Sequence, residues 1–248
     1  MRFHRLFIVF VFAHCVVSAC AGTDVGNPAS EVSVEFLASE ATPGGGPVIL
    51  SNGYTVHQAW LVVAGITIRN GEQCDDAHEF YLPGPIAIDL LAPQPSARLS
   101  VKLPMRNICK FSLHFGALEA TSPGLPTPAE LLDQTLFFRV SAPGRPPQSV
   151  VIARNETVHI LLNNASVALQ PDHNYLAFAL SLEEWFSDQI LASLERVDPS
   201  DPESDTTSTS NAVAAQIWSN VKRSLKLYRT PTPEASLAAA EYLGTMDF

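Results

Sequence analysis

Four polar side chains that could bind a metal ion follow Cys74 closely in the first half of the chain: Asp75, Asp76, His78 and Glu79. Ca²⁺ in proteins takes about six to eight oxygen ligands, and carboxylates supply them. The Asp-x-Asp-x-Asp-Gly spacing of the calcium loop is absent, so the sequence favours a solvated acidic loop without a metal ion or other cofactor. The alternative is a metal-dependent hydrolase that would use Asp75, Asp76 and Glu79.

Histidine and aromatic side chains offer two further kinds of site. The histidines after residue 20 are scattered, at His57, His78, His114, His159 and His173. Those at 57, 114 and 159 fall in predicted strands, so strand pairing could gather them as zinc ligands, although isolated polar or core histidines are the favoured interpretation. Aromatic residues could form a platform for sugars, but strand aromatics usually fill cores; the candidates are Tyr54, Trp60, Phe80 and Tyr81.

The N-terminus has the organisation of a secretory signal peptide. Arg2 and Arg5 precede an apolar run at residues 6–13 that is too short to span a bilayer, and the small residues 17–19 stand before Cys20. This arrangement resembles the lipobox of bacterial lipoproteins, in which the cysteine is acylated and becomes the first residue of the mature chain. The same small residues also satisfy ordinary signal-peptide cleavage, which is the alternative to lipidation.

The cysteine count agrees with the lipobox interpretation. Three cysteines remain after the leader, namely Cys20, Cys74 and Cys109. An odd number in an exported protein leaves one thiol unpaired. Acylation of Cys20 would use one thiol, and Cys74 and Cys109 would then form a disulfide in an oxidising compartment.

The charge balance argues against a nucleic-acid partner. The whole chain has a net charge of −10. Arg2 and Arg5 belong to the leader, which has no acidic residue, so the mature part carries 13 basic and 25 acidic side chains, a net charge of −12. Nucleic acids and anionic lipid head groups recruit proteins through Lys and Arg. We therefore expect no nucleic-acid partner, and contact with a membrane only through the lipid.

Short alternating patterns typical of β-strands fill residues 31–182, and no helical pattern alternates with them. In the clearest strand, residues 108–115, one face carries Cys109, Phe111, Leu113 and Phe115, and the other carries Lys110, Ser112 and His114. Further candidates recur at a spacing of roughly ten residues, separated by Pro and Gly. The pattern predicts a mainly β fold, an antiparallel β-sandwich, with a C-terminal helical appendage.

The C-terminal third has helical signals. Residues 181–184 form a capping box, Ser-Leu-Glu-Glu, which predicts the start of a helix. Val213, Ile217, Val221 and Leu225 recur every four residues, as on one face of an amphipathic helix. A third short helix is expected after Pro233. The predicted segments are a signal peptide (1–19), a flexible tether (20–30), the β-sandwich (31–182), a packing helix (183–197), an acidic Ser/Thr-rich linker (198–210) and C-terminal helices (211–248).

The sequence has several family-like features: residues 22–28 after the lipobox, a long strand ending near Arg69, Cys74-Asp75-Asp76, residues 83–91, Cys109, residues 182–186 and residues 222–225. Together they resemble a family of uncharacterised Gram-negative lipoproteins with an exported β-sandwich domain. The resemblance implies location in the cell envelope and supplies no catalytic residues. Lipoproteins of this type that have a residue other than Asp after the acylated cysteine tend to be sorted to the outer membrane, and residue 21 is Ala. The resemblance therefore implies anchoring at the outer membrane, with the domain facing the periplasm or the exterior.

The motifs of common enzyme classes are missing from the sequence. It has no Gly-x-Ser-x-Gly, His-Glu-x-x-His, Cys-x-x-Cys, P-loop or dinucleotide-binding glycine pattern. The favoured function is therefore a non-enzymatic binding or scaffolding module of the envelope, with a protein or glycan partner. Besides the metal-dependent hydrolase, the remaining alternative is a structural subunit that docks a partner through its C-terminal helix.

Overall fold

The computed structural model describes residues 29–42, 44–93, 97–104, 106–119, 128–186, 190, 211–233 and 237–246. The predicted leader, Cys20 and the acidic linker at 198–210 lie outside these residues. Within them, the predicted mainly β fold is confirmed. The strands are β1 (Ala29–Ala38), β2 (Val48–Ile49), β3 (Thr55–Gly71), β4 (His78–Asp89), β5 (Arg98–Pro104), β6 (Asn107–Phe115), β7 (Leu136–Ser141), β8 (Gln148–Ile152), β9 (Glu156–Leu162), β10 (Val167–Ala168), β11 (His173–Leu180), β12 (Lys226–Thr230) and β13 (Glu241–Met246).

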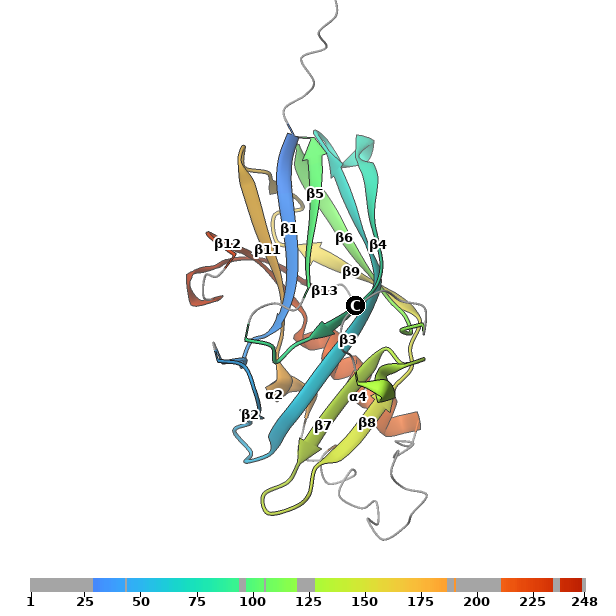
Figure 1. Ribbon diagram of the computed structural model, residues 1–248. Helices are drawn as coiled ribbons and strands as arrows, with labels where there is room; N and C mark the ends of the chain where they lie inside the picture. Colours follow the sequence, from blue (N-terminus) through green and yellow to red (C-terminus); the bar gives the residue numbers. More distant parts are fainter. Residues whose placement is uncertain are drawn as a thin grey trace, which may run out of the picture.

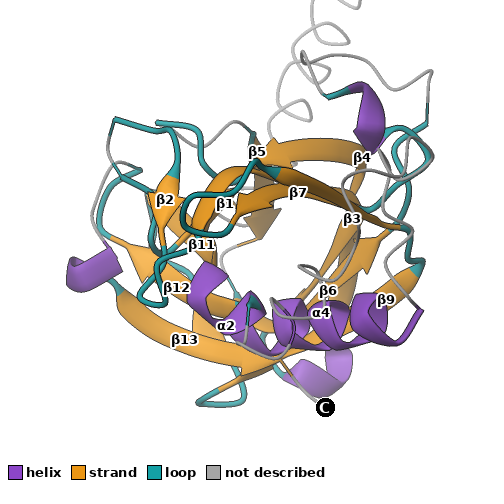
Figure 2. Cartoon of the chain, turned by 90° about the horizontal axis from the view of Figure 1, so that it is seen from below, coloured by secondary structure: helices purple, strands orange, loops and turns teal. Residues whose placement is uncertain are grey.

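All of these strands belong to one hydrogen-bonded sheet with the order β5-β1-β11-β12-β13-β9-β6-β3-β7-β8, while β4 and β2 pair with β3 and β10 pairs with β6. Figure 2 shows that the sheet curls, so that its two sides face each other as the layers of a sandwich do. The strand pairs are antiparallel except for β1 and β11, which run parallel from Glu31 opposite His173 to Ala38 opposite Leu180. A continuous apolar core fills the inside of the curl.

Strand β3 joins the two halves of the sheet (Figure 1). Its first part pairs with β7 and its second part with β6, while β4 follows its other edge from Trp60 to Asn70. The register shifts between Val63 and Gly65 on both edges. Such a bulge bends a strand and increases its twist. One long strand can therefore serve both the upper and the lower parts of the molecule in Figure 1.

The C-terminal segment differs from the prediction after residue 224. The predicted amphipathic helix is present as α4 (Asn211–Ser224), but Leu225 is followed by β12, a 3₁₀ turn η3 (Leu237–Ala239) and β13 instead of further helix. Leu227, Leu243 and Met246 are buried in the common core. Strand β12 pairs with β11, and β13 pairs with β12 and β9. The hydrogen-bonding edges of β11 and β9 therefore outweigh helix propensity here, and this segment is part of the sheet rather than an appendage.

The first predicted helix is short in the described residues. Helix α2 covers Leu182–Trp185 and ends at Phe186, whose ring packs against Phe138 with 4.8 Å between ring centres. The predicted capping box does not form: the Ser181 hydroxyl makes no cap bond to the helix. Instead, the Glu40 carboxylate accepts hydrogen bonds from the Ser181 hydroxyl (2.6 Å) and from the backbone N–H groups of Leu182 (3.0 Å) and Glu183 (3.3 Å). A residue distant in sequence thus satisfies the helix N-terminus.

Helices α2 and α4 lie together inside the lower part of the curled sheet (Figures 1 and 2). The Trp185 indole donates to the Ser224 hydroxyl (2.9 Å), and the Asn220 amide donates to the Trp185 carbonyl (3.3 Å). The apolar face of α4 is buried against the sheet; it consists of Ala214, Ile217, Trp218 and Val221. The apolar face of α4 is therefore covered by the protein itself.

Glu156 on β9 fixes α4 to the sheet. Its carboxylate accepts hydrogen bonds from the Lys222 ammonium group (2.6 Å) and from the Trp218 indole (2.7 Å). Burial tends to raise the pKa of Glu156, but the bonds from Lys222 and Trp218 outweigh it, so that the pKa lies below its ordinary value of 4.5. The ionised form of Glu156 therefore stabilises the folded state.

Replacing Glu156 by Gln is expected to lower the free energy of unfolding at pH 7 by about 1 kcal/mol, because a partly exposed ion pair and its hydrogen bonds become neutral. The wild-type advantage should be present above about pH 4.5 and should vanish as the pH falls through the lower pKa of the folded state. Urea unfolding at pH 7 and pH 3 measures both effects.

The matched control for this experiment is Glu130→Gln, a change of an exposed carboxylate on the 3₁₀ turn η2 (Ala129–Leu131). Burial raises the pKa values of Glu35 and Asp89. Protonation of these two carboxylates at low pH therefore favours the folded state, whereas protonation of Glu156 disfavours it. Only the difference between wild type and Glu156→Gln is therefore diagnostic. An equal loss in both variants, or a difference that persists at pH 3, contradicts the role of Glu156.

Candidate functional site

A polar surface lies on the outer face of four neighbouring strands, β4, β3, β6 and β9. Side chains alternate along these strands, and those pointing inward join the apolar core: Ile66, Ile68, Phe111, Leu113, Val158 and Ile160. The side chains between them point outward and line a pocket of about 240 Å³, formed by Thr67, Arg69, Glu79, Lys110, Ser112, His114, Thr157 and His159. The same alternation that builds the core therefore also builds the pocket.

The strand register orders the outer side chains in rows across the sheet. Glu79, Arg69 and Lys110 lie opposite one another on β4, β3 and β6. The next row continues with Tyr81, Thr67, Ser112 and His159. A third row places Gly65 beside His114 and Thr157. The pocket thus has a charged row at one side and hydroxyl and imidazole groups beside it.

Hydrogen bonds between strands fix the histidine side chains of the pocket. His114 Nε2 lies 2.8 Å from Thr67 Oγ1, and His114 Nδ1 lies 2.9 Å from Thr157 Oγ1. His159 Nδ1 lies 2.9 Å from the hydroxyl of Ser112, whose residue is only 7 % exposed. Both nitrogens of His114 are therefore engaged, and the ring holds three strands together as a rigid polar wall.

The charged row joins two cations on adjacent strands. Arg69 and Lys110 are directly opposite each other, and like charges in this position destabilise a sheet. Among the described residues, neither cation forms an ion pair with a carboxylate within 4.0 Å; Arg69 instead donates to the backbone carbonyl of Asp75 at 3.4 Å. Glu79 lies on the other side of Arg69, so the pocket carries a formal charge of about +1 in an acidic protein.

The ring of Tyr81, beside the pocket, is held against Gly65 although the residue is 59 % exposed. Its hydroxyl donates to the carbonyl of Ala64 at 3.2 Å, and its ring lies so close to Gly65 that a Cβ there would be 2.3 Å from the Tyr81 oxygen and 2.6 Å from ring carbons. The ring also contacts His114 edge-on, with 6.0 Å between ring centres. Gly65 is therefore required for this position of Tyr81, and much of the ring remains open to solvent.

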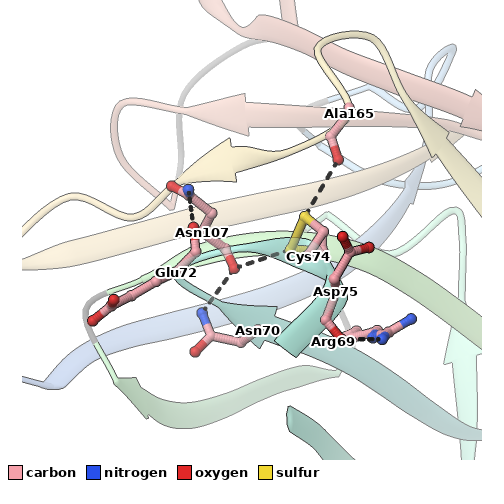
Figure 3. The surroundings of a disulfide bond; sticks show 8 residues. Arg69, Asn70, Glu72, Cys74, Asp75, Asn107 and Ala165 are labelled. Atoms are coloured by element: carbon pink, nitrogen blue, oxygen red, sulfur yellow. Dashed lines mark hydrogen bonds between the residues drawn. A yellow bond between two sulfur atoms is a disulfide. The ribbon is translucent and has the colours of Figure 1, made fainter. Parts of the chain in front are cut away.

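The predicted disulfide Cys74–Cys109 is present and borders the charged row (Figure 3). It connects the 3₁₀ turn η1 (Cys74–Asp76) to β6, one residue before Lys110. The Asn70 amide donates to the Asn107 carbonyl, and the Asn107 amide donates to the Glu72 carbonyl. This network fixes the turn that carries Asp75, whose carbonyl accepts the bond from Arg69.

The proposed metal ligands Asp75, Asp76 and Glu79 are not gathered into a metal site. Asp75 and Asp76 lie in η1, whereas Glu79 lies on the outer face of β4 beside Arg69. The described part of the chain contains no group of three or more His, Cys, Asp or Glu side chains that could hold a metal ion. The geometry of these residues gives no support to the metal-dependent hydrolase.

The histidine and aromatic candidates separate in the structure. His114 and His159 share the pocket, but His57 bonds to Ser141 and His173 bonds to Ser33. Tyr54 and Phe80 pack against the main core, and Trp60 belongs to a second apolar cluster, so Tyr81 alone of the predicted aromatic platform is exposed. The pocket itself was missed by sequence reasoning, although the outward positions of Lys110, Ser112 and His114 were its visible signal.

No helix within the described residues is long and apolar enough to span a bilayer. Comparison of the chain with protein-family models, with curated proteins and with solved structures gave no significant match.

Removing the disulfide by the double change Cys74→Ser and Cys109→Ser is expected to lower the free energy of unfolding by about 3–4 kcal/mol. The bond closes a loop with a sequence separation of 35 residues, which restricts the unfolded chain. Urea unfolding under oxidising and reducing conditions measures this loss. Dithiothreitol should destabilise the wild type by a similar amount and leave the double variant unchanged; a wild type insensitive to the reductant contradicts the prediction.

Proposed function

We propose that this protein is a lipid-anchored, non-enzymatic binding module of the bacterial envelope, and that its ligand occupies the pocket on the outer face of β4, β3, β6 and β9. The main support is the set of polar side chains that hydrogen bonds hold in place on a rigid sheet before any ligand arrives. Such fixed groups lower the entropic cost of binding. Arg69 and Lys110 lie opposite each other, and an anionic group of a ligand would reduce the repulsion between them.

The position of the pocket fits an anchor at Cys20. Ala29 at the start of β1 pairs with Pro104, and the connection that follows leads to Asn107, which pairs with Gly71 at the end of β3. The charged row of the pocket, near the paired ends of β3 and β6, therefore lies toward the same end of the sheet as the beginning of β1. Figure 1 shows the beginning of β1 at the upper end of the molecule. The segment from Cys20 to Ala29 can reach at most roughly 30 Å, so a lipid on Cys20 would keep the pocket near the membrane.

Changing Cys20 to Ala is expected to move the protein from the membrane fraction to the soluble fraction, because acyl chains supply the proposed membrane attachment. Fractionation and mass spectrometry of the mature N-terminus provide the measurement. Cys74→Ser with Cys109→Ser is the control, since it removes cysteines without removing the anchor. A Cys20→Ala protein that is processed normally but remains in membranes after a high-salt wash, which screens the charge contacts of a protein held only by its ligand, contradicts lipid anchoring.

Binding at the pocket can be tested with the Cys20→Ala chain, which lacks the lipid and sediments with envelope vesicles only if it binds them. Thr157→Trp places a large side chain at an exposed position of the pocket lining and is expected to weaken sedimentation at least fivefold. Leu161→Trp, at an exposed position of the same strand outside the lining, is the control.

The same sedimentation assay separates the classes of ligand. Protease digestion of the vesicles before the assay removes protein partners and leaves glycans and lipids. Equal sedimentation of the Thr157→Trp and Leu161→Trp chains would contradict a ligand site at this pocket, as would a failure of the Cys20→Ala chain to sediment at all.

A further inference from the structure

We infer that the ligand of this pocket is an anionic carbohydrate, a sugar that carries a carboxylate or phosphate group. This inference rests on the proposed function, because it names the chemical class that the proposed binding module would recognise. Three independent features of the same surface lead to it: the paired cations, the held aromatic ring and the row of hydroxyl and imidazole groups.

The cations account for the negative charge of the ligand. The strand register places Arg69 and Lys110 opposite each other, and Lys110 has no carboxylate within 4.0 Å among the described residues, because Glu79 lies across Arg69 on β4. An anion that bridges the two groups would remove this repulsion, and a guanidinium group binds the planar oxygens of a carboxylate or phosphate with two parallel hydrogen bonds. Glu79, on the far side of Arg69, limits the charge of the pocket and argues against a highly charged polymer.

The aromatic ring distinguishes a sugar from a small inorganic anion. Tyr81 stands one row from the cations, on the same face of β4 as Glu79, and it is fixed by its bond to the Ala64 carbonyl and by its contact with Gly65. A fixed, exposed aromatic ring offers an apolar surface on which the C–H groups of a sugar ring can lie. A free phosphate ion would have no use for this surface.

The polar wall suits the hydroxyl groups of a sugar. Thr67, Ser112, Thr157 and the two histidines supply short side chains that can both donate and accept hydrogen bonds. The two nitrogens of His114 already contact hydroxyl groups of the protein, which makes this ring a poor metal ligand and favours a role as part of the wall. A site with an apolar platform, a few fixed polar groups and a charge anchor is the usual composition of a small-ligand pocket.

The test uses titration calorimetry at low salt with the Cys20→Ala chain. The probes are tetragalacturonate, its fully methyl-esterified neutral counterpart, glucose 1-phosphate, glucose and inorganic phosphate. We expect at least one anionic sugar to bind tenfold or more tightly than its neutral counterpart and than inorganic phosphate. The two anionic sugars distinguish a carboxylate ligand from a phosphate ligand, and either result supports the inference.

Variants assign the effect to the side chains named above. Lys110→Gln is expected to weaken the anionic sugar five- to tenfold without weakening its neutral counterpart, and without lowering the midpoint of thermal unfolding, because it removes a repulsion. Tyr81→Ala is expected to weaken both sugars at least fivefold. The matched controls are Arg139→Gln and Tyr242→Ala, which change an exposed cation on β7 and an exposed tyrosine on β13 outside the pocket.

Three results would overturn the inference: equal affinity for charged and neutral sugars, tight binding of inorganic phosphate that does not depend on Tyr81, or no binding of any sugar probe. In each case the sedimentation experiment with Thr157→Trp still decides the proposed function. If that substitution weakens sedimentation, the pocket binds a different class of ligand; if it has no effect, the binding module itself is refuted.

Discussion

The architecture depends on the hydrogen bonds by which the C-terminal strands join the two parts of the curled sheet. Strand β12 bonds to β11, and β13 bonds to β9, so the last described residues connect the part of the sheet that begins with β5 and β1 to the part that contains β6 and β3. Without β12 and β13, two open edges would face water and the core between them would lose Leu227, Leu243 and Met246. The two parts of the sheet are therefore connected only when β12 and β13 are in place.

The strand register of this sheet also determines which side chains form the proposed site. The strands that form the pocket have the core on one side and the polar surface on the other, so a shift of register by one residue would exchange the two sets of side chains. Phe111 and Leu113 hold β6 in register from the inside, while Lys110, Ser112 and His114 are placed by the same register on the outside. The rigidity of the pocket is thus a consequence of core packing, and the inter-strand hydrogen bonds of His114 add to it.

Sequence patterns predicted those features that depend on neighbours within one strand or one helix. Alternation identified both faces of β6, the four-residue spacing identified α4, and the cysteine count identified the disulfide. Apart from this disulfide, features that depend on distant partners were not predicted. Lys226–Thr230 and Glu241–Met246 form strands because β11 and β9 offer open edges, and Glu40 caps α2 from 141 residues away. For the same reason the pocket was missed, since strand order decides that Arg69 and Lys110 become neighbours.

The neighbouring cations are the feature that general requirements of folding explain least. The acidic chain has carboxylates available, and elsewhere it uses them to pair its basic groups, as in Glu35 with Arg98, Glu156 with Lys222 and Glu184 with Lys226. Arg69 and Lys110 differ from these ion pairs, because they face each other without a carboxylate between them. A carboxylate at position 112, opposite Thr67 and on the same face of β6 as Lys110, would reduce their repulsion. That position holds instead a serine bonded to His159. The fixed polar groups and the net positive charge of this surface are therefore what support the proposed anionic ligand.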